Sequence, residues 1–379
     1  MTSGGTDVLP PLIDHHTHSV VIADLTPDAF RSLLTESDRA PVADPFDSAL
    51  GLAVRRWCPP ALGLSEHATA DAYLSRRRAL GPAEATKRLL GAAGLSTLLV
   101  DTGLVAAAGH PLLPLPELSA LAGAPVHQVV RLESVAERLA ARAPAAADWS
   151  AALTEALTAE LAGALAVKSV LAYRHGLDIP AERPSPAEVI EAAGRFLVDQ
   201  PARLTDQVLL RQLLWTAVDL CAERRPALPI QFHTGFGDPD LTLHRADPAL
   251  LTPFIRAVEP TGVPLVLLHC YPYHRQAGYL AQVFPHVYAD TGLTLNHVGP
   301  RATTVLGELL ELAPFGKVLA STDGYGLPEL HLAGAAQFHH AVADLTWQWR
   351  RAGACTAVDG ERLALLLAEE NARELYHLP

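Results

Sequence analysis

Five side chains in this 379-residue chain could together hold a divalent metal ion. They end four apolar runs: His16 and His18 end "LPPLIDHHTH", His233 ends "PIQFH", His269 ends "PLVLLH" and Asp323 ends "VLASTD". Imidazole nitrogens and carboxylate oxygens are ligands that a borderline cation such as zinc prefers. The pattern therefore predicts a metal site at a place where several strands end.

The His-x-His pair carries part of this prediction. On an extended strand alternate residues point the same way, so His16 and His18 can face one point. His15 is then expected to point to the opposite side of the strand. A single histidine after a strand is usually a hydrogen-bonded residue of the core or rim. The metal site is indicated because all five residues occur together, each after a strand-like run.

Eight apolar, β-branched runs alternate with helical patterns along the chain. The expected strands span 8–18, 96–103, 125–133, 164–173, 228–235, 264–271, 286–292 and 317–324. Continuous apolar runs fit parallel strands that are buried on both faces. The order predicts an α/β fold, a (β/α)8 TIM barrel forming a single domain over 1–379, with its site at the carboxyl ends of the strands. A doubly wound open sheet is the alternative.

Two connections are too long for simple barrel units. Residues 19–95, after the first strand, are mostly helical and are expected to form a cap. Residues 174–227, after the fourth strand, hold two helical patterns, and helices over 328–376 are expected to close the barrel. Such insertions commonly shape or cover the pocket of a barrel enzyme.

Composition limits the partners and the compartment. The formal net charge of -12 argues against nucleic acid and anionic membranes as partners. The four cysteines show no CxxC spacing, which suits a reduced, cytoplasmic protein. No apolar run approaches the roughly 20 residues of a membrane span, and no signal peptide is evident. We expect a soluble protein that acts on a small molecule.

Lys168 is unusual because only three of the 29 basic residues are lysines. It lies in the strand-like run "ALAVKSVLAY", whereas most other positive charges are arginines. A buried lysine can lose its proton, but a guanidinium effectively cannot. Lys168 could also bind a substrate carboxylate or pair with a nearby acid such as Glu133.

The chain resembles the amidohydrolase superfamily, whose members are metal-dependent (β/α)8 barrels. The segments "DHHTH", "FHTG", "LLHCYPYHRQAGYL" and "STDGYGLPELH" match in order, and the resemblance runs from Asp14 to "NARELY". The segments "VKSVLAYRHGLDI" and "NARELY" are most similar to the amidohydrolase-related group that includes the N-terminal part of FluG-like proteins. The resemblance implies one or two divalent ions, with zinc preferred, and a possible homodimer.

The resemblance also implies a role for Lys168. In binuclear members, a lysine at the end of strand four is carboxylated by CO2, and the carbamate bridges two metals. The implied binuclear ligands are His16, His18, Lys168 and Asp323 for one ion, and Lys168, His233 and His269 for the other. The implied mononuclear ligands are His16, His18, His233 and Asp323, with His269 free for acid–base work. Decarboxylase-like members lack the carbamate, so an uncarboxylated or purely structural Lys168 remains open.

The function implied is hydrolysis of an amide-type C–N bond in a small, carboxylate-bearing molecule. Metal-activated water would attack, and Asp323 would serve as general acid and base. The main alternative is a non-oxidative decarboxylase with one metal, and an isomerase resembling uronate isomerase is a third reading. An inactive binding domain is the non-enzymatic alternative.

Six residues near the expected strand ends are candidates for substrate binding. Arg174 could bind a carboxylate through its planar fork, although an ordinary salt bridge fits it as well. The full set is Glu133, Tyr173, Arg174, Gln231, Tyr271 and His274.

Overall fold

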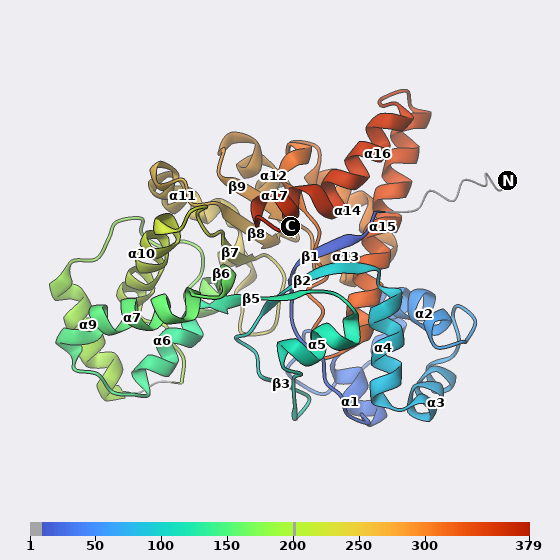
Figure 1. Cartoon of the computed structure of the whole chain (residues 1–379), viewed down its shortest axis with the longest axis horizontal. Coiled ribbons are helices and arrows are strands. Elements are labelled where there is room, and N and C mark those ends of the chain that lie inside the picture. Colours follow the sequence, from blue (N-terminus) through green and yellow to red (C-terminus); the bar gives the residue numbers. More distant parts are fainter. Residues whose placement is uncertain (1–9, 200–201) are drawn as a thin grey trace.

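The computed structural model describes residues 10–199 and 202–379 and has a barrel of eight parallel strands at its centre (Figure 1). The strands are β1 (Leu12–Thr17), β2 (Leu95–Asp101), β5 (Val126–Arg131), β6 (Ala164–Ser169), β7 (Ile230–Thr234), β8 (Leu265–His269), β9 (Val287–Asp290) and β10 (Val318–Leu319). Each pairs in parallel with the next, in that order. The predicted TIM barrel is confirmed. Positions 8 and 9 of the first expected strand lie outside the described residues.

The barrel closes through the segment that follows β10. The His15 amide donates to the Ala320 carbonyl at 3.2 Å, and the Asp323 amide donates to the His16 carbonyl at 3.1 Å. Asp323 was expected to end strand eight, but β10 covers only Val318–Leu319. Asp323 instead lies in the segment beyond it, with a φ of +50° that regular strands do not adopt.

Helices surround the barrel and connect its strands. They include α5 (Leu115–Ala122), α6 (Leu132–Ala140), α7 (Trp149–Leu161), α11 (Thr252–Val258), α12 (His274–Val283), α13 (Thr294–Val298) and α14 (Ala302–Leu309). The loop after β2 holds a hairpin of β3 (Ala106–Ala107) and β4 (His110–Pro111), which the sequence did not predict. In the described part of the chain, no helix combines the length and apolar character needed to cross a membrane.

The insertion after β1 is helical, as expected. It contains α1 (Pro27–Ser32), α2 (Ala49–Ala61), α3 (Ala70–Leu80) and α4 (Pro82–Ala92). Helices α2 and α4 pack on the long α15 (Pro328–Arg351). Buried Arg77 donates to Glu329 Oε1 at 2.8 Å, and Tyr73 donates to the same oxygen at 2.9 Å. The insertion therefore packs on, and hydrogen-bonds to, the C-terminal helix α15.

The second insertion, after β6, contains α8 (Leu171–Arg174), α9 (Pro186–Asp199) and α10 (Gln207–Glu223). The chain ends in α16 (Ala357–Leu365), a π-helical turn over Leu366–Glu370, and α17 (Asn371–Leu375). Helix α17 packs on β1 and β10. Its side chains share an apolar cluster with inward-facing strand residues, among them Ile13, Leu99, Val129, Ala166 and Val266. These positions precede the polar strand ends, so α17 covers the amino-terminal end of the barrel.

Candidate metal centre

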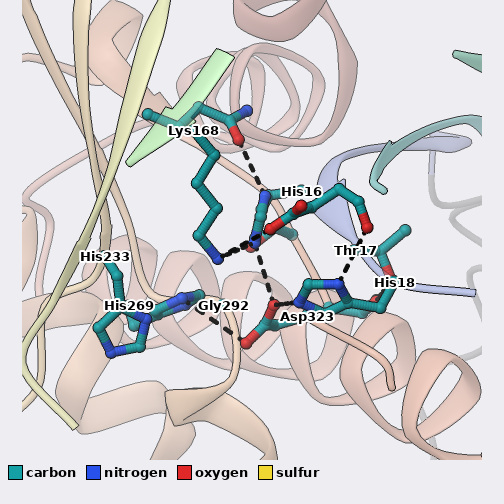
Figure 2. Close-up of polar contacts among 12 residues, drawn as sticks. His16, Thr17, His18, Lys168, His233, His269, Gly292 and Asp323 are labelled. Atoms are coloured by element: carbon teal, nitrogen blue, oxygen red, sulfur yellow. Dashed lines mark hydrogen bonds and ion pairs between the residues drawn. The ribbon is translucent and has the colours of Figure 1, made fainter. Parts of the chain in front are cut away.

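A cavity of about 600 Å³ opens at the carboxyl ends of the strands. Its lining includes His18, Lys168, His233 and Asp323. His16 and His269 are fully buried, and Figure 2 shows them converging with the other four. The structure therefore brings together all six residues that the sequence proposed as metal ligands.

An irregularity in β1 shapes this end of the barrel. Between Asp14 and Thr17, β1 advances one residue more than its partner β2, which is a β-bulge. We expected the His15 side chain to point to the opposite side of β1 from His16. Because of the bulge, it points into the barrel instead. Its Nε2 lies 2.7 Å from Asp290 Oδ2, inside the barrel beneath His16. The expected orientation of His15 was wrong, since regular alternation does not hold across the bulge.

Asp323 is the centre of the cluster (Figure 2). Its Oδ1 lies 3.1 Å from His16 Nε2 and 3.3 Å from His18 Nε2, and its Oδ2 lies 3.6 Å from His269 Nε2. Among the residues that the structure describes, two sets of candidate ligand atoms have all members within 4.8 Å of one another. They are His16, His269 and Asp323, and His16, His18 and Asp101.

The protonation of His16 favours metal binding. Its Nδ1 lies 2.9 Å from Gln231 Oε1, and since an amide oxygen only accepts, Nδ1 must donate. Burial, assisted by Lys168, lowers the pKa of His16 to about 3, so the ring is neutral. The Nε2 lone pair therefore faces the Asp323 carboxylate. Lone pairs facing one another in a buried site are what a cation would stabilise.

His269 supplies a second indication. It is fully buried, and neither ring nitrogen has a hydrogen-bond partner among the described residues. Its backbone has a φ of +67°, and Asp290 Oδ1 accepts from its amide at 2.6 Å. Unpaired buried polar atoms and strained backbone are both rare outside functional sites. The donor set fits a divalent metal.

Lys168 is 2% exposed and lies among these candidate ligands. Its Nζ is 2.8 Å from His16 Nε2 and 3.6 Å from Asp101 Oδ2. Burial lowers the pKa of Lys168, while the carboxylates of Asp101 and Asp323 oppose that shift. The expected alternative partner, Glu133, instead accepts from Ser169 Oγ at 2.6 Å and lies in the first turn of α6 rather than at the end of a strand.

Asp101 and Arg131 were not identified from the sequence. Asp101 ends β2, and Arg131 ends β5 and donates to Asp101 Oδ2 at 2.6 Å. Burial opposes ionisation of Asp101, but Arg131 and Lys168 outweigh it and hold its pKa well below the usual range. The run "LLVD" carries the same signal as the other sites, an acid after an apolar strand, and could have revealed Asp101.

Tyr173 and Arg174 line the cavity. The Tyr173 hydroxyl is 2.9 Å from His233 Nε2, and Arg174 pairs with Glu137 at 3.1 Å. The His233 ring lies 4.6 Å from that of His269, measured between centroids. Burial, together with His269 and Lys168, holds the pKa of His233 well below its usual value, which keeps a ligand lone pair available.

The other substrate candidates do not line the cavity. Gln231 lies beneath it, against His16, and Tyr271 stacks on His274 with ring centroids 5.7 Å apart. His274 Nε2 contacts Glu308 Oε2 at 2.6 Å. These contacts give Gln231, Tyr271 and His274 structural partners, and a role in substrate binding stays a prediction for each.

Comparison with known proteins finds one similar curated protein sequence and several similar solved structures. Protein fluG of Emericella nidulans is 35% identical over 222 residues, which cover 56% of this chain and 25% of that protein. The matched part is thus about a quarter of the length of this curated relative. No model of a protein family matches the chain.

Solved structures match almost the whole chain. A Lactobacillus casei ATCC 334 protein, provisionally described as a metal-dependent hydrolase, is 30% identical, with a TM-score of 0.86 and coverage of 98% of this chain and 96% of that one. Uronate isomerase of Thermotoga maritima is 12% identical, with a TM-score of 0.63 and coverage of 98% and 95%. The second likeness is one of fold alone.

Proposed function

This chain belongs to the amidohydrolase superfamily, and from that premise we propose that it hydrolyses an amide-type C–N bond in a small, carboxylate-bearing molecule. One observation carries the proposal. Four histidines, Lys168 and Asp323 meet at the floor of a cavity of about 600 Å³, which is large enough for a small molecule.

The ligands divide according to the number of ions. With two ions, Lys168 would be shared between the pair His16 and His18 and the pair His233 and His269, with Asp323 on the first ion. With one ion, His269 would be free to assist proton transfer. A bound divalent ion, for which zinc is our first choice, lowers the pKa of water toward ~7 and polarises a carbonyl.

Asp323 carries the proton in this proposal. Its carboxylate lines the cavity, and both of its oxygens face histidine nitrogens. It would accept a proton from the attacking water and return it to the leaving nitrogen.

Carboxylation of Lys168 belongs to the binuclear form. A neutral amine adds CO2 to give a carbamate and releases one proton, so the reaction needs the lowered pKa that burial produces. An uncarboxylated lysine would remain a cation paired with Asp101. The two states predict different metal contents.

The cations around the cavity support the proposal that the substrate carries a carboxylate. Arg131 at the end of β5, Lys168 in β6 and Arg174 in α8 all line it. Arginine binds carboxylates through two parallel hydrogen bonds. Each of these cations also has an acidic partner in the protein, so a substrate carboxylate would share them.

The first test is the metal content after purification with zinc and ¹³C-bicarbonate. Lys168→Ala should reduce two metals per chain to one or none and remove a carbamate signal in the ¹³C NMR spectrum. Lys87→Ala, which changes an exposed lysine, is the matched control. One metal in both the wild type and Lys168→Ala would reject the bridging carbamate.

A mononuclear decarboxylase is the second candidate. The contact of Lys168 with Asp101 at 3.6 Å favours it, because a paired carboxylate stabilises the protonated amine. Turnover in H₂¹⁸O distinguishes the two candidates. A hydrolase incorporates ¹⁸O into its product, whereas a decarboxylase releases CO2 and leaves the product unlabelled.

A further inference from the structure

A buried hydrogen-bond network beneath the metal centre connects its ligands to the end of the chain. Gln231 lies between His16 and Tyr376, with Oε1 2.9 Å from His16 Nδ1 and Nε2 2.9 Å from the Tyr376 hydroxyl. Tyr376 directly follows α17, is 2% exposed, and has its hydroxyl 3.0 Å from His15 Nδ1.

The orientation of Gln231 and His15 follows from two groups that only accept, the Asp290 carboxylate and the His15 carbonyl. The Asp290 carboxylate only accepts, so His15 Nε2, at 2.7 Å, must donate to it. The other ring nitrogen, His15 Nδ1, is hydrogen-bonded to the Tyr376 hydroxyl. The hydroxyl oxygen in turn accepts from Gln231 Nε2. That contact turns Gln231 Oε1 toward His16 and makes His16 Nδ1 the donor.

From this orientation we infer that Tyr376 is a positioning residue for the metal centre. It orients the Gln231 amide and so holds His16 in the tautomer whose Nε2 lone pair faces Asp323. The inference rests on the proposed function in that His16 must be a metal ligand. Without the hydroxyl, only the His15 carbonyl, at 2.9 Å, still fixes Gln231 Nε2. A rotated amide would favour a proton on His16 Nε2, the atom needed for metal binding.

The network also reaches a second ligand. Asp290, which accepts from His15 through Oδ2, accepts from the His269 amide through Oδ1 at 2.6 Å. Ser321 Oγ donates to the same carboxylate at 2.5 Å. Tyr376 therefore contacts a network that fixes a side chain on β1 and a strained backbone position on β8.

Helix α17 is anchored in a way that keeps the hydroxyl in place. Asn371, its first residue, donates to the carbonyls of Phe315 and Val318 at 2.7 and 2.8 Å. These bonds attach the helix to the start of β10. Figure 1 shows α17 lying against the barrel strands, with the C-terminus beside it.

Tyr376→Phe removes the hydroxyl and keeps the ring. The matched control is Tyr288→Phe, because Tyr288 packs against the same apolar cluster and its hydroxyl has no hydrogen bond within the described residues. Two quantities are measured: zinc affinity by chelator competition, and the tautomer of His16 in metal-free protein by ¹⁵N NMR of the histidine rings.

We expect Tyr376→Phe to weaken zinc binding about 10–100-fold, the usual effect of losing a partner behind a metal ligand, and to reduce the Nδ1–H form of His16. The control should change neither. Wild-type affinity and an unchanged His16 tautomer in a folded Tyr376→Phe protein would overturn the inference. If that variant does not fold, Gln231→Met tests the same link with the same two outcomes.

The NMR measurement separates this inference from the proposed function. A wild-type protein that binds no zinc would reject the metal-dependent hydrolase. The His16 tautomer would still show whether the hydroxyl orients the ring, because the metal-free protein is measured.

Discussion

Asp101 shows how a single carboxylate can control the charge around the ligands. It contacts Arg131 at 2.6 Å and Lys168 at 3.6 Å, and all three side chains are largely buried. Two cations beside a site for a divalent cation would repel it. The carboxylate removes most of that repulsion, since buried charges interact strongly over such distances.

Asp101→Asn should therefore weaken zinc binding by about 10–100-fold, because Arg131 and Lys168 lose their counter-charge. Chelator competition measures the change. Asp240→Asn is the control, since Asp240 pairs with Arg203 at the exposed rim of the same cavity. Equal affinities for the two variants would contradict this role of Asp101.

At this scale the sequence predicted which candidate ligands come together in the fold, but not what surrounds them. The types of His16, His233 and the other candidate ligands, and their places after apolar runs, are visible in single stretches of the sequence. The inward position of His15 depends on a bulge that is defined only by pairing with β2. The pairing of Asp101 with Arg131 joins two strands, which the order of residues does not reveal.

Among the elements, the junction between the first insertion and α15 has the most unusual chemistry. Arg77 and Glu329 form an ion pair at 2.8 Å, with side chains 6% and 0% exposed. The hydroxyl of Tyr73 donates to the same Glu329 oxygen. A buried pair of this kind stabilises little by itself, but the loss of one partner leaves an uncompensated charge.

Glu329→Gln should lower the free energy of unfolding by about 3–5 kcal/mol, because Arg77 is left buried without a counter-ion. The double variant Arg77→Met with Glu329→Gln should recover much of this loss. Urea denaturation measures both. Glu84→Gln, in the exposed Arg88–Glu84 pair, should cost less than about 0.5 kcal/mol. A cost for Glu329→Gln as small as that of the control would count against the argument.

The elements were predicted where their signal is local. The strands and the helical insertions follow from runs of apolar residues and their period. The extent of β10 could not be predicted, because Ala320 and Asp323 still hydrogen-bond to β1 but lie beyond the regular strand, which ends at Leu319. The β3–β4 hairpin was missed because its two-residue strands are too short to show apolar alternation.

For the molecule as a whole, buried histidines link stability to pH. His339, on α15, has its pKa lowered to about 4 by burial, against about 6.5 in an unfolded chain. Between these values the unfolded state binds more protons, so stability falls as the pH drops from 6.5 to 4. At higher pH the contribution is fully present.

His339→Gln should reduce this acid sensitivity by about 1–2 kcal/mol, after allowance for the partial exposure of the ring. Urea denaturation at pH 4.5 and pH 7.5 gives the difference. His244→Gln, at an exposed position, should leave the pH dependence unchanged. A pH dependence of His339→Gln identical to that of the wild type would show that this ring does not contribute.

The seam between β1 and the segment after β10 has a consequence for how the protein is made. The partners across it, such as His16 and Asp323, lie near opposite ends of the chain. During synthesis on the ribosome, one edge of β1 stays unpaired until the segment after β10 has been made. Such long-range closure is slow, and open strand edges invite aggregation. We therefore expect nascent chains that end before β10 to associate with chaperones and to bind no metal, because they lack Asp323.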